Sequence, residues 1–522
     1  MVFDAAMIAL LAGMLPGQPA VRGDSSISLV VLVTVDQMRA DYLARYAGQW
    51  SGGLARIYNG GTVFEHGQQD HGATETAPGH STLLSGRYPA HTGVVLNSRG
   101  VQDPSSPVLG TADTVGASPR RFRGTTLYDW LLARDAGTRV LSVSRKDRAA
   151  IFPIGRARVP VYWLYNGTFN TSRYYADSLP AWVQAFNRRI DLNALTNISW
   201  NLLLPESSYA EPDSFGFENG GADFTFPHRP ATVPGAVARR LNQLPWIDSL
   251  TLDFALQGVQ ALGLGRRGRP DLLSISLSTT DAVGHAFGPD SREIHDQLLR
   301  VDHWLGQFLD SLGRLLPNAN TVLVLTADHG VTSLPEYTVT VRHRPAGRVS
   351  LAAVARGARA FGVESDGGLL FANLDSLRGH GVKIDSVSQA LAAEALALPG
   401  VAQVYTPRSL AQAPAADAGA ALWRHLLPAD YGWLVSATTK PGYVWSSGGL
   451  DAEHSSANQD DIEVPIAFYG KSIAAQKIQR PVSTTDIAPT LAALLGITPT
   501  EPVDGHTLTE VFGRASAVVR ER

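Results

Sequence analysis

The 522-residue chain contains no cysteine and few lysines, and both shortages restrict its chemistry. Without cysteine it can form no disulfide, no thiolate site for zinc or an iron–sulfur cluster, and no cysteine nucleophile. Any metal ion must therefore be bound by histidine, aspartate, glutamate or neutral oxygen atoms. Five of the 44 basic residues are lysine, so a lysine within a motif is less expected by chance than an arginine.

The chain also has no large excess of either charge. Its 44 basic and 47 acidic residues leave a net charge of -3, so no global positive field attracts nucleic acid or an anionic membrane. Hydrophobic residues make up 44% and charged residues 17% of the sequence, which is typical of a globular protein and excludes disorder as the main state. We predict no nucleic-acid partner.

Long apolar runs are missing as well. The run Ala5–Leu15 is too short to span a bilayer, and no later segment is long and apolar enough to do so. With the Pro, Gly and small residues that follow it, this run resembles the apolar region and cleavage zone of a secretory signal. We predict that residues 1–24 are a signal peptide, that the protein has no integral membrane segment, and that it is periplasmic or secreted.

Three apolar, strand-like segments are each followed by an acidic residue. They are Ile27–Val35 with Asp36, Leu272–Ser278 with Asp281, and Thr321–Thr326 with Asp328. Apolar residues spaced by four and three between Ile294 and Leu312 predict a core-facing helix between the last two segments. This order indicates an α/β fold with a mostly parallel central sheet flanked by helices, whose ligands bind where the strand C-termini converge.

Two regions interrupt the pattern and are predicted to be cap-like insertions. The first is rich in aromatic, Asn, Ser and Pro residues, and the second combines strand-like pieces with Ala/Leu-rich helices, of which Ser386–Leu398 is the clearest. Long insertions of this kind commonly carry function. The predicted organisation is a catalytic core in three parts, 25–150, 246–339 and 446–522, with insertions at 151–245 and 340–445.

Six side chains are candidates for a metal site. Asp281 and His285 are four residues apart, so on a helical turn they face the same way. Asp328 and His329 are adjacent at the end of a strand. Each pair alone is more often a helix cap or a satisfied surface pair, but three acidic strand ends, two of them with a histidine, favour a metal site. The candidates are Asp36, Asp281, His285, Asp328, His329 and His454.

The candidate nucleophile is Thr76 in Thr74-Glu75-Thr76-Ala77-Pro78-Gly79-His80. A threonine hydroxyl needs a base or a metal to become a good nucleophile. A turn at Pro78-Gly79 would place it at a helix N-terminus, where N–H groups and the helix dipole favour negative charge. Alone, a threonine in this setting is more often an ordinary N-cap, so the prediction depends on the surrounding motifs.

Together these motifs resemble the alkaline phosphatase superfamily. The ordered set is Asp36, Thr76 in TAPGHSTLLSGRYPAHTGV, DAVGH, ADHG, the late His454 and TDIAPTLAALLG. The TAPGH segment is similar to the type I phosphodiesterase/nucleotide pyrophosphatase branch and to the phosphate-insensitive bacterial alkaline phosphatases. The segment around His454 departs from the family pattern, because Ser455 follows the histidine where a glycine is expected.

The resemblance implies a zinc-dependent phosphomonoesterase with two Zn²⁺ ions. One ion would be bound by Asp281, His285 and His454, and the other by Asp36, Asp328 and His329, with Thr76 beside it. Thr76 would attack phosphorus in a small phosphorylated substrate and form a phosphothreonine that is then hydrolysed. Two cations that clamp the attacking and leaving oxygens make this chemistry coherent.

Three further residues are expected to bind the transferred phosphoryl group. A monoester carries a dianionic group, which needs extra positive donors, and Lys146 and Arg148 resemble the phosphate clamp of the phosphate-insensitive alkaline phosphatases. Asn97 matches the family position that hydrogen-bonds a phosphoryl oxygen. A Lys-Asp-Arg triplet is otherwise a common solvated turn, and two alternatives stay open: a phosphodiesterase or nucleotide pyrophosphatase with the same metals, and an inactive relative that uses the fold for binding.

Overall fold

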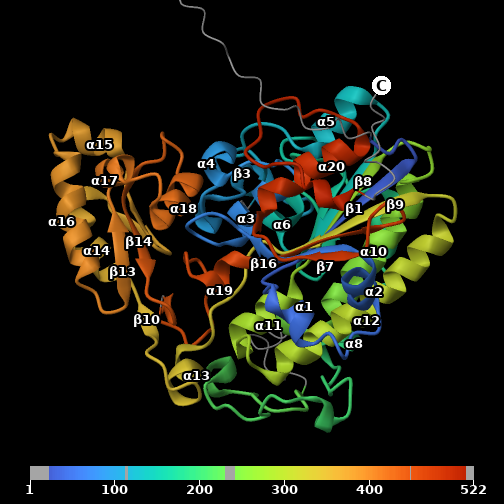
Figure 1. Cartoon of the computed structure of the whole chain (residues 1–522), viewed down its shortest axis with the longest axis horizontal. Coiled ribbons are helices and arrows are strands. Elements are labelled where there is room, and N and C mark those ends of the chain that lie inside the picture. The colour runs from blue at the N-terminus through green and yellow to red at the C-terminus, as the bar shows by residue number, and fades with distance from the viewer. Residues whose placement is uncertain (1–22, 112–115, 230–240, 447, 513–522) are drawn as a thin grey trace, which may run out of the picture.

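A ten-stranded sheet forms the centre of the protein in the computed structural model, which describes residues 23–111, 116–229, 241–446 and 448–512 (Figure 1). Nine strands lie in the order β17-β2-β16-β9-β1-β8-β5-β6-β7, and β18 pairs with β2. The strands are β1 (Ile27–Val35), β2 (Thr62–Gln68), β5 (Val140–Ser144), β6 (Val161–Tyr165), β7 (Thr168–Asn170), β8 (Asp271–Leu277), β9 (Asn320–Thr326), β16 (Glu463–Gly470), β17 (Gln476–Ile478) and β18 (Val482–Ser483).

The five central strands β9, β1, β8, β5 and β6 are parallel, whereas β16 and β7 run antiparallel to their neighbours. Val35 at the end of β1 pairs with Leu277 at the end of β8, and Thr34 pairs with Thr326 at the end of β9. The residues that follow these strands therefore emerge side by side at one edge. The predicted α/β fold with a mostly parallel sheet is confirmed.

Helices cover both faces of the sheet (Figure 1). Along β1, Val31 and Val33 pack into the core on one face, and Val30 and Leu32 into the core on the other, as the alternation of a doubly buried strand requires. The first face carries α2 (Gly53–Gly60), α10 (Trp246–Leu262) and α12 (Arg292–Leu315); the second carries α3 (Thr76–Leu83), α5 (Leu127–Arg134), α6 (Asp147–Ile151) and α20 (Ile487–Leu495).

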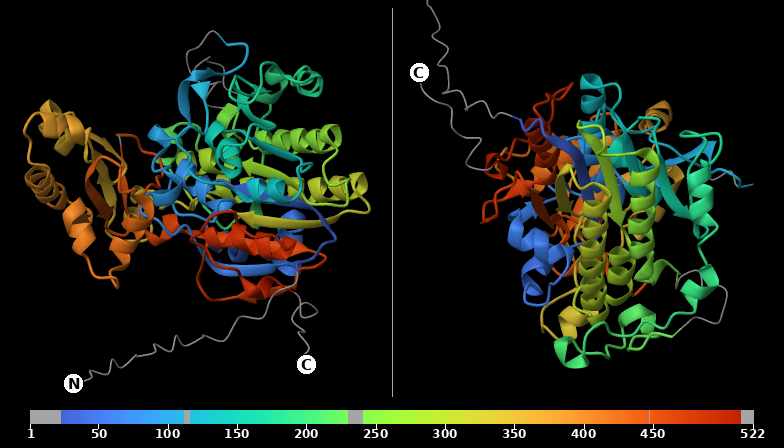
Figure 2. Two further views of the ribbon diagram at one scale, coloured as in Figure 1. Left: turned by 90° about the horizontal axis from the view of Figure 1, so that it is seen from above. Right: turned by 90° about the vertical axis from the view of Figure 1, so that its right-hand side faces the viewer.

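Residues between 340 and 445 form a separate body beside the central sheet, coloured yellow to orange in Figures 1 and 2. Its antiparallel sheet has the order β11-β12-β14-β13, and it has its own apolar core. Strand β10 pairs with β15 below it. The elements are β10 (Gly347–Val349), α14 (Ala352–Gly357), β11 (Glu364–Asp366), β12 (Leu369–Phe371), α15 (Leu374–Gly379), α16 (Ile384–Leu396), β13 (Val401–Tyr405), α17 (Pro407–Gln412), α18 (Ala418–Leu426), β14 (Trp433–Thr439) and β15 (Tyr443–Trp445).

The segment 151–245, expected to be an insertion, divides into two parts. Strands β6 and β7 extend the central sheet as a hairpin, whose turn at Asn166-Gly167 has positive φ at both residues, as a tight hairpin turn requires. The following residues run over the face of the sheet that carries α10 and α12, and they include the short helices α7 (Ala181–Asn187) and α8 (Leu192–Thr196). The central sheet therefore extends into this segment, in which the aromatic composition gave no clear strand pattern.

No helix in the described part of the chain is long and apolar enough to cross a bilayer. The predicted signal peptide lies almost wholly outside the described residues, which begin at residue 23.

Candidate active site and metal centre

The C-terminal ends of β1, β8 and β9 bring together most of the predicted site residues. Asp36 directly follows β1, Asp328 and His329 follow β9, and Asp281 and His285 lie on α11 (Thr279–Phe287), which follows β8. His454 comes from the loop between β15 and α19 (Gln459–Ile462). All of these side chains are buried except that of His285, which is partly exposed. The sheet thus positions five of the six candidates, and a distant loop supplies the sixth.

One group of potential ligands consists of Asp36, Asp328 and His329, whose ligand atoms all lie within 4.8 Å of one another. His329 Nε2 is 3.6 Å from Asp36 Oδ1 and 3.5 Å from Asp328 Oδ2. Among the described residues, Asp36 Oδ1 and His329 Nε2 have no hydrogen-bond partner. Buried acceptors without a donor are costly, and a bound cation would satisfy them. The geometry fits the second ion site expected from the sequence.

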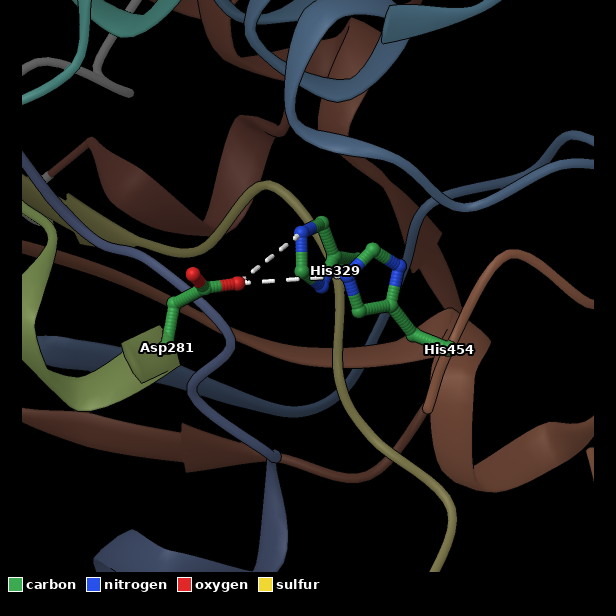
Figure 3. A group of neighbouring side chains, drawn as sticks. All are labelled: Asp281, His329 and His454. Atoms are coloured by element: carbon green, nitrogen blue, oxygen red, sulfur yellow. Dashed lines mark ion pairs between the residues drawn. The ribbon is translucent and has the colours of Figure 1, made fainter. Parts of the chain in front are cut away.

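A second group contains Asp281 and His454, with His329 as the third member (Figure 3). His454 Nε2 is 3.9 Å from Asp281 Oδ1, and His329 Nε2 is 4.0 Å from the same oxygen. His285 approaches this oxygen as well, with its Nε2 at 3.4 Å, and its ring centre is 5.0 Å from that of His454. All three histidines therefore converge on Asp281, and His329 lies between the two groups.

Backbone carbonyls fix the orientation of these rings. The Nδ1 atoms of His285, His329 and His454 lie 2.6, 2.9 and 2.6 Å from the carbonyl oxygens of Ala452, Gly330 and Thr74. A ring that donates from Nδ1 to a carbonyl presents Nε2 to a ligand, as is usual in metal sites. Ser455, which replaces the expected glycine, still adopts the left-handed backbone with φ of 69°, so the loop that carries His454 keeps the shape a glycine would favour.

Burial of three carboxylates in one site shifts the pKa values of the groups there. Burial and repulsion from Asp328 raise the pKa of Asp36 to about 6. Burial also acts to raise the pKa of Asp281, but Lys146 and His285 outweigh it and hold that pKa well below its ordinary value. Burial and the neighbouring His329 and His285 keep the pKa of His454 well below its usual range, so its imidazole is neutral. Clustered carboxylates beside a neutral imidazole are a donor set suited to divalent cations.

Thr76 begins helix α3 and is buried beside these carboxylates. Its hydroxyl is 3.2 Å from Lys146 Nζ. Helix α3 can approach so closely because residue 79 is a glycine: a Cβ there would lie 2.1 Å from the carbonyl oxygen of Asp328. The predicted placement of Thr76 at a helix N-terminus is thus observed, and the dipole of that helix favours negative charge near its hydroxyl.

The side chain of Asn97 lies against the first turn of α3. Its Oδ1 accepts a hydrogen bond from the Ala77 N–H at 2.8 Å, and its own backbone N–H donates to Glu75 Oε2 at 2.6 Å. Because Oδ1 is engaged, Nδ2 is the end of the amide left to donate to a bound oxyanion. Burial and the nearby Asp366 raise the pKa of Glu75 to about 8, so this neighbour of Thr76 is largely a neutral acid at pH 7.

Lys146 lies between two of the carboxylates at the start of helix α6. Its Nζ is 2.8 Å from Asp36 Oδ2 and 2.7 Å from Asp281 Oδ2. Arg148 follows in the same helix. Its charge partly offsets the rise in the pKa of Glu75, and its buried Nε has no hydrogen-bond partner among the described residues. Both cations therefore border the site.

Some residues of the site were not expected from the sequence. Gln37 donates its backbone N–H to Asp328 Oδ1 at 3.2 Å and its Nε2 to Asp281 Oδ1 at 3.4 Å. His80 lies 3.1 Å from Asp328 Oδ2 and 2.9 Å from the carbonyl oxygen of Thr76. The only sequence signal for Gln37 and Glu75 was that they are adjacent to Asp36 and Thr76. Nothing in the sequence pointed to Asp366.

Two groups of potential metal ligands lie beside a hydroxyl at the carboxyl edge of a parallel sheet, an arrangement suited to metal-assisted phosphoryl transfer. Comparisons with known proteins agree. The family model of type I phosphodiesterase / nucleotide pyrophosphatase matches residues 30–395. The chain belongs to this family, and the predicted membership of the alkaline phosphatase superfamily is confirmed.

Relatives are similar over almost their entire length. The chain is 30% identical to alkaline phosphatase PafA of Elizabethkingia meningoseptica, over 93% of this chain and 94% of the relative. It is 30% identical to alkaline phosphatase PhoV of Synechococcus elongatus, over 93% and 92%, and 32% identical to alkaline phosphatase PhoK of a Sphingomonas species, over 93% and 91%.

Solved structures show the same fold. The crystal structure of wild-type PafA superposes with a TM-score of 0.85 at 28% identity, covering 93% of this chain and 99% of that chain. Murine ectonucleotide pyrophosphatase/phosphodiesterase 5 superposes with a TM-score of 0.53 at 16% identity, over 93% of this chain, which shows a shared fold alone.

Proposed function

We propose that the protein is a zinc-dependent alkaline phosphatase that hydrolyses phosphate monoesters through a phosphothreonine at Thr76. The observation that carries the proposal is the position of the Lys146 ammonium, which lies within hydrogen-bond or ion-pair distance of the Thr76 hydroxyl and of the carboxylates of Asp36 and Asp281. Full-length similarity to three proteins named alkaline phosphatases supports it. The apolar run Ala5–Leu15 supports a location outside the cytoplasm.

Two zinc ions fit the donor set of the site. Asp36, Asp328 and His329 would hold one ion, and Asp281, His285 and His454 the other. When bound, such a pair of ions supplies Lewis acidity that stabilises the attacking and leaving oxygens of an in-line displacement. His329, which lies within reach of both groups, would keep the two sites adjacent, and Gln37 would hold one carboxylate from each in place.

In the proposed reaction the Thr76 oxygen forms a bond to phosphorus while the bond from phosphorus to the leaving alcohol breaks. The hydroxyl proton passes to solvent on attack, and the leaving oxygen takes up a proton from solvent to become the free alcohol. Water then attacks the phosphothreonine, releasing inorganic phosphate and restoring the threonine hydroxyl. The orientation of Thr76 is maintained by its place at the start of α3, where His80 contacts its carbonyl oxygen.

Three side chains would bind the oxygens of the transferred group. Lys146 supplies a point charge next to Thr76 Oγ1, Arg148 supplies a buried N–H without another partner among the described residues, and Asn97 supplies its Nδ2. A dianionic phosphoryl group gains more from two cations than the monoanionic group of a diester does, so these residues favour monoester over diester hydrolysis.

The first test compares an aryl phosphate with its methyl diester. We expect kcat/KM for the monoester to exceed that for the diester by at least ~100-fold, because the two cations interact with one additional charge. Steady-state kinetics of the zinc-loaded enzyme measure the ratio. A preference for the diester would support the alternative, a phosphodiesterase or nucleotide pyrophosphatase, and would rule out the proposed function.

The clamp itself is tested by replacing both cations. Lys146→Ala with Arg148→Ala should lower kcat/KM for the monoester by ~10²-fold or more and for the diester by less than ~10-fold, because only the dianionic group uses the second charge. The control is Lys383→Ala, which removes an exposed lysine at the start of α16. Equal losses on both substrates would contradict a clamp specific for monoesters.

A further inference from the structure

A cavity of about 320 Å³ lies between the 340–445 region and the central domain. We call it the side cavity. Val349, Leu351 and Trp445 provide its apolar surface, and Asp366, Glu453 and His454 are among the polar residues that line it. Its volume lies at the lower end of the range for small-molecule sites, so it has room for the alcohol part of a small phosphate ester.

The side cavity borders the proposed active site at two places. Its lining includes His454, whose Nε2 is 3.9 Å from Asp281 Oδ1. The lining also includes Asp366, which accepts a hydrogen bond from the hydroxyl of Ser98, the residue next to Asn97. A molecule in this cavity therefore lies beside the group around Asp281 and beside the turn that carries Asn97.

The charged side chains of the lining are carboxylates, of which Glu453 also lies 3.8 Å from His285 Nδ1. Asp366 and Glu453 contribute carboxylates, and Ser365, Ser446 and Ser455 add hydroxyl groups. None of the described residues that line the cavity is a lysine or arginine. Arg348, the nearest arginine along the chain, is committed to Glu336 and to two backbone carbonyls. Such a lining attracts a positive charge and hydrogen-bond donors, and repels a second anion.

We infer that the side cavity receives the alcohol part of the substrate and selects small amino alcohols over anionic alcohols. The inference rests on the proposed function, because it names the class of phosphate monoester that the same site prefers. The phosphoryl group would remain at Thr76, while the ammonium group of the alcohol would face Asp366 and Glu453.

Three substrates of similar size and different charge test the inference. They are 2-aminoethyl phosphate, propyl phosphate and 2-carboxyethyl phosphate, in which the alcohol carries a cation, no charge or an anion. In the wild-type enzyme we expect kcat/KM to fall in that order. The intrinsic reactivities of the three esters differ, so the decisive quantity is how a variant changes the ratio of kcat/KM for the aminoethyl ester to that for the propyl ester.

Asp366→Asn should lower this ratio about five- to tenfold, as expected for loss of one half-buried ion pair, and should leave kcat/KM for propyl phosphate within about twofold. The asparagine retains an oxygen that can accept the Ser98 hydrogen bond. Glu453→Gln provides a second variant should Asp366→Asn fold poorly; its zinc content is measured alongside, because Glu453 Oε2 lies 3.8 Å from His285 Nδ1. The control is Glu364→Gln on the same hairpin, whose side chain is largely exposed and does not line the side cavity.

Binding gives a readout that is independent of turnover. Calorimetry with Thr76→Ala should show tighter binding of 2-aminoethyl phosphate than of propyl phosphate, and Asp366→Asn in that background should remove the difference. An unchanged ratio in both carboxylate variants, or equal binding of the two esters, overturns the inference. Failure of the wild-type enzyme to hydrolyse any monoester contradicts the proposed function instead, and calorimetry still tests the cavity.

Discussion

Removal of metal ions is expected to abolish activity: chelated protein should lose at least ~10³-fold in kcat/KM for an aryl phosphate, and added zinc should restore it. The reason is that the reacting oxygens lose the Lewis acidity of the ions, while Lys146 remains paired with the carboxylates of Asp36 and Asp281. Kinetics before and after dialysis against chelator, with metal content measured on the same samples, give the result.

The same change should lower stability, since ions that bind only the folded chain stabilise it. Zinc at 100 times its dissociation constant contributes ~2.7 kcal/mol per site, so the unfolding temperature should rise when zinc is added. Asp328→Asn should reduce the zinc content of the protein, because it weakens one ligand group. Full activity in protein with less than a tenth of an equivalent of metal would contradict the mechanism.

Replacement of the proposed nucleophile should have an effect of similar size. Thr76→Ala is expected to lower kcat/KM by ~10⁴-fold or more, because it removes the oxygen that bonds to phosphorus. Thr76→Ser should keep a large part of the activity, since serine retains the hydroxyl. Quenched reactions should show a phosphorylated wild-type protein and no phosphorylated Thr76→Ala.

A matched control lies on the same helix. Thr82→Ala removes the same atoms from a buried threonine of α3, whose hydroxyl donates to the carbonyl oxygen of Gly79 at 2.8 Å. It should keep activity within about threefold, since it touches neither metal ligands nor substrate. Comparable losses in Thr76→Ala and Thr82→Ala would show that disturbance of the helix, and not loss of a nucleophile, explains the effect.

The central sheet could be predicted from the sequence because its strands are buried on both faces and read as continuous apolar runs. The strand predicted at Ile27–Val35 is β1, and the helix predicted from Ile294 to Leu312 is part of α12. The helix predicted at Ser386–Leu398 is α16, shifted by two residues at each end. The strand was recognisable as a continuous apolar run, and the two helices were recognisable from the spacing of their apolar residues.

Other features depended on tertiary contacts. The aromatic strands β6 and β7 carried little alternation, although the Asn166-Gly167 turn between them was a usable hairpin signal. The position of His329 between two ligand groups follows from the approach of a loop more than 120 residues away, which brings in His454. The hydrogen bond from Ser98 to Asp366 joins residues 268 positions apart, and a local sequence pattern cannot predict such a contact.

The most direct measurement is a crystal structure of zinc-loaded protein with anomalous scattering at the zinc edge. We expect two ions about 4 Å apart, one bound by Asp36, Asp328 and His329 next to Thr76 Oγ1, and one bound by Asp281, His285 and His454. A single ion, or ions bound away from Thr76, would contradict this expectation.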